Sequence, residues 1–137
     1  MMPMSIPLGL LPGVQGLLKA TAMDKAYQSA HAAIKRYRWQ GSTYESKIHC
    51  LFGDSATFDY SPFYGKVDLF FVDGVYSYEY VGSDTINAFK CINQGVVLWH
   101  DYGRMGINGV SKWSHELART KKIFSVPGSS LAHMIVD

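Results

Sequence analysis

The sequence predicts a single α/β domain whose sheet is mostly parallel and ends in an antiparallel hairpin. Three apolar runs, at residues 47–53, 67–73 and 95–101, are nearly continuous rather than alternating. Such runs are typical of strands that are covered on both faces, as in a parallel sheet. Helical periodicity separates the last two runs, and a turn separates two short β-prone segments at the C-terminus. This order of elements favours a layered sheet.

Two helices are predicted between and after these runs, because apolar residues recur at three- and four-residue steps. The first covers residues 78–92 and the second covers residues 109–120. Two strands follow, at 123–126 and 131–136, with a Pro-Gly-Ser-Ser turn between them. Strands joined so closely must be antiparallel neighbours, since a parallel return needs a crossover of roughly a dozen residues or more.

The N-terminal third carries a weaker pattern. An apolar stripe predicts a helix over residues 24–38, preceded by a strand or turn that runs to about Met23. Residues 17–24 also have the composition of a strand that ends at Asp24. Prolines and glycines interrupt the apolar residues 1–18.

Composition narrows the classes of function. The chain has 137 residues, of which 47% are hydrophobic and 18% are charged, so it can build a core and is not disordered. The formal net charge is only +2, and the two signs are scattered along the chain. The only basic runs are short, at 35–38 and 121–122, and are typical of solvated helix ends or strand entries. No nucleic-acid partner is therefore expected.

The cysteines and the N-terminus indicate a location. Cys50 and Cys91 lie in apolar stretches without metal-binding spacing, so both are expected to be buried thiols in a reducing compartment. No run of about 18 apolar residues is present, so no membrane partner is expected. Residues 1–18 lack the basic start of a secretory signal, and a cytoplasmic location is the expectation.

Polar residues gather where the predicted strands end. Asp54 and Ser55 follow the first run, Asp73 ends the second, and His100 and Asp101 end the third. In open α/β sheets, ligands bind beyond the carboxyl ends of the strands. Carboxylates and an imidazole at one edge can bind a divalent ion, or act as a general base with an orienting partner. A strand-final Asp can instead cap a helix or form a turn, an alternative that is strongest for Asp54.

These residues carry a resemblance to a known family. Residues 73–78 read Asp-Gly-Val-Tyr-Ser-Tyr, and the run at 95–101 ends in His-Asp. Together with 53–55, 109–110 and 126–132, they resemble the later part of a class I S-adenosylmethionine-dependent methyltransferase. The resemblance is to the small-molecule group with Asp-Gly-x-His-x-Tyr after the fourth strand and His-Asp after the fifth. It implies a Rossmann-like sheet of seven strands whose last two form a reversed hairpin.

The resemblance also implies roles for the residues at the strand ends. Asp54 and Ser55 would lie beside the adenine of S-adenosylmethionine. Asp73 would lie near the reacting centre, and His100 with Asp101 would line the pocket of a small-molecule methyl acceptor. In related metal-dependent O-methyltransferases, acids at the positions of Asp73 and Asp101 hold Mg²⁺. The expected function is methyl transfer to a small molecule, at oxygen, with Mg²⁺ as a candidate second cofactor.

The chain departs from the family pattern in two places. Tyr76 stands where the signature has His, and a phenol is a poor base near neutral pH. The glycine-rich turn after the first strand is missing. Gly9, Gly13 and Gly16 have a different spacing, and no strand is expected before them.

Spacing suggests where that glycine-rich turn would belong. Asp24 lies 30 residues before Asp54, which makes it a candidate for the ribose-binding acid of the cofactor site, or else a helix cap. The glycine loop would then precede Met1. The expectation is an N-terminally incomplete methyltransferase-like domain, with a divergent or truncated part at 1–46 and a recognisable part at 47–137.

Two other functions remain open. A methyltransferase-fold remnant without activity would serve as an interaction or oligomerisation module, because a missing strand leaves apolar surface that a second copy can cover. A homo-oligomer is expected on the same ground. A nucleotide- or NAD-binding Rossmann domain shares the layering but needs the same absent glycine turn, and it ranks last.

Overall fold

The computed structural model of the chain describes residues 2–7, 16–20, 41–106 and 108–137. Seven strands, two α-helices and two short 3₁₀ turns lie in these ranges. In chain order they are β1 (Met2–Pro7), β2 (Gly16–Ala20), η1 (Glu45–Lys47), β3 (Ile48–Gly53), η2 (Ser61–Phe63), β4 (Val67–Val72), α2 (Tyr78–Cys91), β5 (Gly95–Trp99), α3 (Asn108–Leu117), β6 (Phe124–Ser125) and β7 (Ala132–Val136). The helix expected at residues 24–38 and the candidate ribose ligand Asp24 lie outside the described residues.

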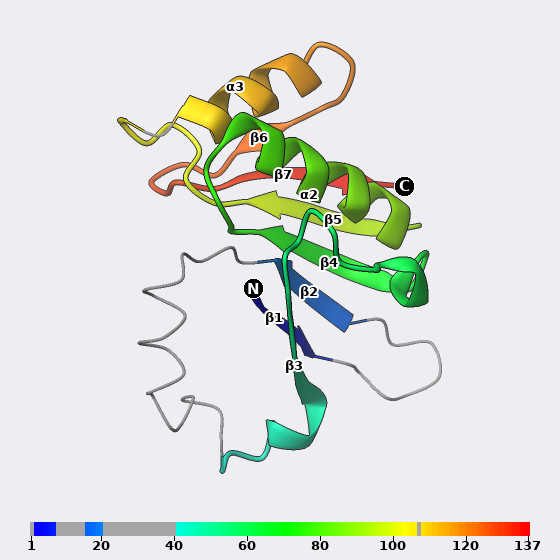
Figure 1. Cartoon of the computed structure of the whole chain (residues 1–137). Coiled ribbons are helices and arrows are strands. Elements are labelled where there is room, and N and C mark those ends of the chain that lie inside the picture. Colours follow the sequence, from blue (N-terminus) through cyan, green and yellow to red (C-terminus); the bar gives the residue numbers. More distant parts are fainter. Residues whose placement is uncertain (1, 8–15, 21–40, 107) are drawn as a thin grey trace.

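The strands form one mixed sheet in the order β3-β1-β2-β4-β5-β7-β6 (Figure 1). The pairs β2–β4 and β4–β5 are parallel, and the other four pairs are antiparallel. The predicted α/β class and the C-terminal hairpin of β6 and β7 are therefore confirmed. The sheet is parallel only at its centre, so it is less parallel than the sequence predicts.

The strand β3 lies at the far edge of the sheet. Both β1 and β2 lie between it and β4, and β3 pairs antiparallel with β1 from Met2↔Gly53 to Pro7↔Ile48. Two antiparallel steps restore the direction, so β3 still runs the same way as β2, β4 and β5. Its carboxyl end therefore reaches the same edge of the sheet, although it is not a neighbour of β4.

The strand β1 was not predicted. Pro3 and Pro7 lie within it, and proline is uncommon in strands because it cannot donate a ladder hydrogen bond. The expectation that no strand precedes the N-terminal glycines is therefore wrong. However, the next described element is β2, an antiparallel neighbour of β1. A dinucleotide-type glycine turn instead links a strand to a helix.

The two helices cover one face of the sheet (Figure 1). The α2 helix begins after the Ser77 cap, whose hydroxyl accepts a hydrogen bond from the Tyr80 amide. Its inner face packs on Phe70 and Trp99, both fully buried. The Trp99 indole donates to the Thr85 hydroxyl at 2.9 Å, so the largest core side chain is tied to α2. This packing fixes the carboxyl ends of β4 and β5 relative to α2.

One further prediction concerns Cys91. Cys91, at the end of α2, is fully buried, and burial raises the pKa of its thiol to about 12. The expectation of a buried thiol at this position is confirmed. Within the described ranges, no helix has the length and apolar character needed to cross a membrane.

Candidate functional site

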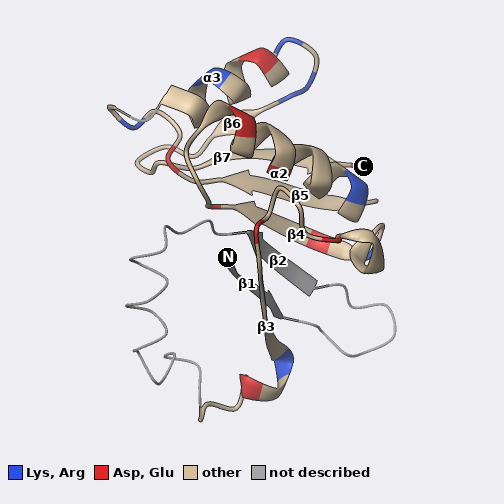
Figure 2. Cartoon of the chain, viewed as in Figure 1, with Lys and Arg blue, Asp and Glu red and all other residues tan. Residues whose placement is uncertain are grey.

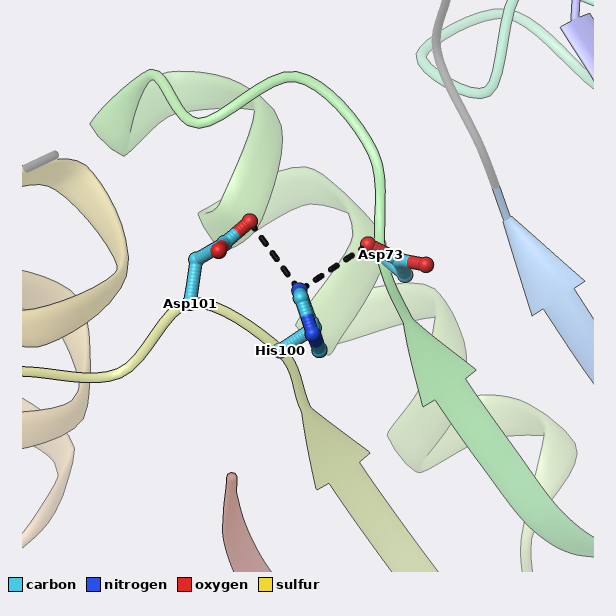
Figure 3. A group of neighbouring side chains, drawn as sticks. All are labelled: Asp73, His100 and Asp101. Carbon is cyan, nitrogen blue, oxygen red and sulfur yellow. Dashed lines mark ion pairs between the residues drawn. The ribbon is translucent and has the colours of Figure 1, made fainter. Parts of the chain in front are cut away.

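Asp73, His100 and Asp101 meet at the carboxyl edge of the sheet, as the sequence predicts (Figure 3). The His100 Nδ1 atom lies 3.4 Å from Asp73 Oδ1 and 3.1 Å from Asp101 Oδ2. One ligand atom from each residue lies within 4.8 Å of the other two. Acidic positions follow both β4 and β5 on the same edge (Figure 2). The three side chains therefore form one cluster, called the edge cluster below.

Neighbouring parallel strands bring Asp73 and His100 together. Both residues directly follow their strands, and the His100 amide still donates to the Val72 carbonyl at 3.0 Å, which extends the β4–β5 ladder by one bond. The Phe71 ring meets the imidazole edge-on, with ring centroids 6.1 Å apart. The imidazole is therefore held by the backbone, by an aromatic ring and by two carboxylates.

Asp101 joins the cluster through an unusual backbone conformation. It has φ 63°, and it is the one non-glycine residue with positive φ among the described residues. Asp tolerates this left-handed region better than most residues do. The following amide, of Tyr102, donates to the Ser130 carbonyl at 3.0 Å, which ties the turn to the hairpin loop before β7. The carboxylate of Asp101 is thereby buried against His100.

Arg104 is a fourth member of the site that the sequence analysis did not single out. Its Nη1 donates to Asp101 Oδ1 at 2.9 Å, although the Arg104 side chain is 59% exposed. Burial raises the pKa of the Asp101 carboxyl, but hydrogen bonds from Arg104 and His100 outweigh burial and leave that pKa below its ordinary value. The Asp-x-x-Arg spacing across a glycine-containing turn was the available signal.

The His100 side chain is partly exposed, whereas its Nδ1 atom is buried. The Nδ1 atom is buried between the carboxylates, while the side chain as a whole is 36% exposed. Two carboxylates favour the proton on Nδ1, which leaves Nε2 as the acceptor. The imidazole is thus oriented by acids and partly exposed, which is the arrangement of a general base with an orienting partner.

The predicted cofactor residues Asp54 and Ser55 lie against α2. Asp54 Oδ1 accepts from the Ala56 amide at 2.9 Å, and Oδ2 accepts from the Tyr80 hydroxyl at 3.2 Å. Ser55 is fully buried and faces Asp84. Asp54 and Ser55 thus contact Tyr80 and Asp84 of α2. The residues of the edge cluster instead directly follow β4 and β5.

Asp84 is a buried acid whose charge the sequence analysis did not consider. It is 1% exposed, and burial raises the pKa of its carboxyl to about 6. The Ser55 hydroxyl lowers this pKa, and the negative charge of Asp54 raises it. Asp54 and Ser55, which are expected beside the adenine, therefore lie next to a buried carboxyl that is costly to ionise.

The edge cluster contains the types of ligand that divalent cations bind. Two carboxylates and an imidazole are ligands for Mg²⁺, Mn²⁺ and similar ions, and their separation is compatible with one shared ion. However, both Asp101 oxygens already have partners, one in Arg104 and one in His100. A cation at this position competes with these two contacts.

Comparison with known proteins gives no assignment: no family model, curated protein or solved structure matches the chain. The function is therefore inferred from the chemistry of the site and from the resemblance of its motifs.

Proposed function

We propose that the protein is an S-adenosylmethionine-dependent methyltransferase that acts on an oxygen of a small molecule. The observation that carries the proposal is the edge cluster, in which an oriented, partly exposed imidazole lies between two carboxylates. The strand order β4-β5-β7-β6, with β7 antiparallel to both of its neighbours, agrees with the reversed hairpin that the resemblance implies. Both features lie within residues 47–137, the part of the chain that resembles the methyltransferase family.

The chemistry requires a positioned nucleophile and a place for one proton. The acceptor oxygen attacks the sulfonium methyl group, the C–S bond breaks, and its electrons return to sulfur, which becomes a thioether. The acceptor O–H proton passes to His100 Nε2, and Asp73 and Asp101 stabilise the resulting imidazolium through Nδ1. Holding the acceptor in line with the methyl group supplies much of the rate.

The binding roles follow from position. Asp54 is the candidate for the adenine end of the cofactor, because it is held at the carboxyl end of β3 by Tyr80 and Ala56. Asp73 and Asp101 are the residues that would hold Mg²⁺. When bound, such an ion stabilises the acceptor as an anion. Asp24 remains a prediction for the ribose, and the side chain of Ser55 is turned toward the core.

Formation of S-adenosylhomocysteine tests the proposal without knowledge of the acceptor. The full chain is incubated with S-adenosylmethionine and a panel of phenols and hydroxy acids, and the product is measured by mass spectrometry. We expect acceptor-dependent product that His100→Ala lowers by about 100-fold, the low end of what a general base contributes. His115→Ala is the matched control, because His115 bonds to Tyr102 on the α3 side. Product formation that His100→Ala leaves unchanged would contradict the role of His100.

A second candidate function rests on the sheet face opposite α2. Phe124, His133 and Leu98 are cross-strand partners on that face, and Phe124 is 52% exposed. Ile135, two residues beyond His133, is 61% exposed. These side chains favour an interface with a second copy of the chain. Sedimentation over a range of protein concentrations tests this second function. A dimer that Ile135→Lys dissociates would support an oligomerisation module, and a monomer at every concentration would contradict it.

A further inference from the structure

We propose that Arg104 is a built-in counter-ion of the edge cluster, which occupies the position of a divalent cation at Asp101 and keeps such cations weakly bound. The inference rests on the proposed function, because it concerns the regulation of the same site. It assigns Arg104 a positioning role: the guanidinium holds the Asp101 carboxylate toward His100 in the absence of metal.

Both oxygens of the Asp101 carboxylate already have partners. Its carboxylate is 2% exposed, with Oδ1 on Arg104 Nη1 at 2.9 Å and Oδ2 on His100 Nδ1 at 3.1 Å. A divalent ion needs at least one of these oxygens as a ligand. Displacing His100 would disturb the imidazole that Asp73 also contacts. The exposed guanidinium is therefore the partner that an entering cation must replace.

Arg104 lies on a turn that follows Asp101. The Arg104 amide approaches the Asp101 carbonyl at 3.4 Å, and the preceding Gly103 amide donates to the Ser111 hydroxyl at 2.8 Å. Gly103 and Gly106 both have positive φ, and open space lies around both Cα atoms. The turn thus folds the arginine back onto Asp101 while its outer side stays free. The guanidinium has room to leave without rearrangement of the core.

The positive charge of Arg104 also opposes the entry of a cation. Asp73 and Asp101 give the cluster two negative charges, and Arg104 returns one positive charge. A divalent ion at the carboxylates and a guanidinium on the same carboxylate repel each other, because both are positive and within a few ångströms. Removing the arginine therefore both frees an oxygen ligand and removes this repulsion. A neutral glutamine at this position does not repel an entering ion, so the Arg104→Gln variant should bind a divalent cation more tightly than the wild type.

Manganese binding to the full chain tests the inference. Mn²⁺ is titrated into the wild type, Arg104→Gln and Arg119→Gln, and free Mn²⁺ is counted by electron paramagnetic resonance. We expect Arg104→Gln to bind about tenfold more tightly than the wild type, with the difference shrinking at high salt. Arg119→Gln removes the same charge beyond the end of α3 and should match the wild type. Asp73→Asn in the Arg104→Gln background should abolish the gain.

The outcomes separate this inference from the proposed function. A gain of about threefold or more that needs Asp73 supports the inference. Equal affinity in the wild type and Arg104→Gln, or no binding by either protein, overturns it, because Arg104 is then not what controls cation entry. Neither of these results bears on S-adenosylhomocysteine formation. Loss of that product with an intact manganese effect would instead overturn the proposed function.

Discussion

His100 Nδ1 lies 3.1 Å from the carboxylate of the next residue in the chain, Asp101. Consecutive residues of a strand point to opposite faces, so such a contact is not available within β5. It forms because β5 ends at Trp99 and because Asp101 adopts a left-handed conformation. The short path from strand to turn thus determines which side chains reach the edge cluster.

Substitution of Asp101 should reveal this backbone conformation. Asn tolerates positive φ, whereas Ala has no compensating polar side chain, so Asp101→Ala should be about 1 kcal/mol less stable than Asp101→Asn. Both variants lose the negative charge that pairs with Arg104, which makes Asn the matched control for that charge. Urea unfolding measures the difference. Equal free energies of unfolding for the two variants would show that the left-handed turn is not required.

Stability should depend on pH through Asp84. The pKa of this buried carboxyl is about 6 in the folded protein, against an ordinary value of 3.8. Between these values the folded protein binds more protons than the unfolded chain, so its stability falls as the pH rises through this window and stays lower above it. Asp84→Asn removes that loss of stability. The free energy of unfolding of this variant, relative to that of the wild type, should therefore increase by up to roughly 3 kcal/mol between pH 4 and pH 7.

Urea unfolding of Asp84→Asn and the wild type at both pH values checks this. Asp59→Asn is the control, because Asp59 is exposed and hydrogen bonds from Ser61 lower the pKa of its carboxyl. That variant should show no gain as the pH rises. A constant difference between Asp84→Asn and the wild type at the two pH values would mean that Asp84 does not titrate as described.

The hydrogen bond between Trp99 and Thr85 should matter for stability. Thr85→Val keeps the shape of the side chain but leaves the buried indole N–H without its acceptor, which should cost about 2 kcal/mol. Thr85→Ser keeps the hydroxyl and loses only a methyl group, so it should cost less. Chemical denaturation of the two variants gives the comparison, and a larger loss for Ser than for Val would contradict the role of the hydrogen bond.

Gly109 should not tolerate a side chain. A Cβ atom there would lie 1.9 Å from the Tyr76 carbonyl oxygen, so Gly109→Ala must push α3 away from the segment that follows Asp73. We expect a loss of more than about 2 kcal/mol, despite the better helix propensity of alanine. Gly103→Ala meets open space and bears only the strain of positive φ. Thermal unfolding of both variants should rank Gly109→Ala as the less stable.

Nearly continuous apolar runs predicted β4 and β5, and three- and four-residue apolar steps predicted the two helices. The sequence placed β4, α2, β5 and the final hairpin within a few residues of their observed bounds, and it brought Asp73, His100 and Asp101 together from strand ends alone. The strand at Met2–Pro7 was not predicted, because its prolines argue against a strand.

Contacts that depend on turns could not be predicted in the same way. The pairing of Arg104 with Asp101 depends on a left-handed residue, and the burial of Ser55 depends on the path of the loop after β3. The Asp-x-x-Arg spacing permits the first contact but does not predict the left-handed turn that forms it, and no spacing predicts the burial of Ser55. The sequence therefore located the candidate site but missed its arginine, and it did not anticipate the buried acid behind Ser55.

The free energy of unfolding of the full chain, with and without S-adenosylmethionine, tests the central claim most directly. A ligand that binds only the folded protein at about 100 times its dissociation constant should add roughly 2.7 kcal/mol. We expect a saturable gain of this size, with a similar gain for S-adenosylhomocysteine and none for adenosine monophosphate at equal concentration. Unchanged stability at millimolar concentrations of both cofactor forms would contradict the assignment of this sheet edge to methyl transfer.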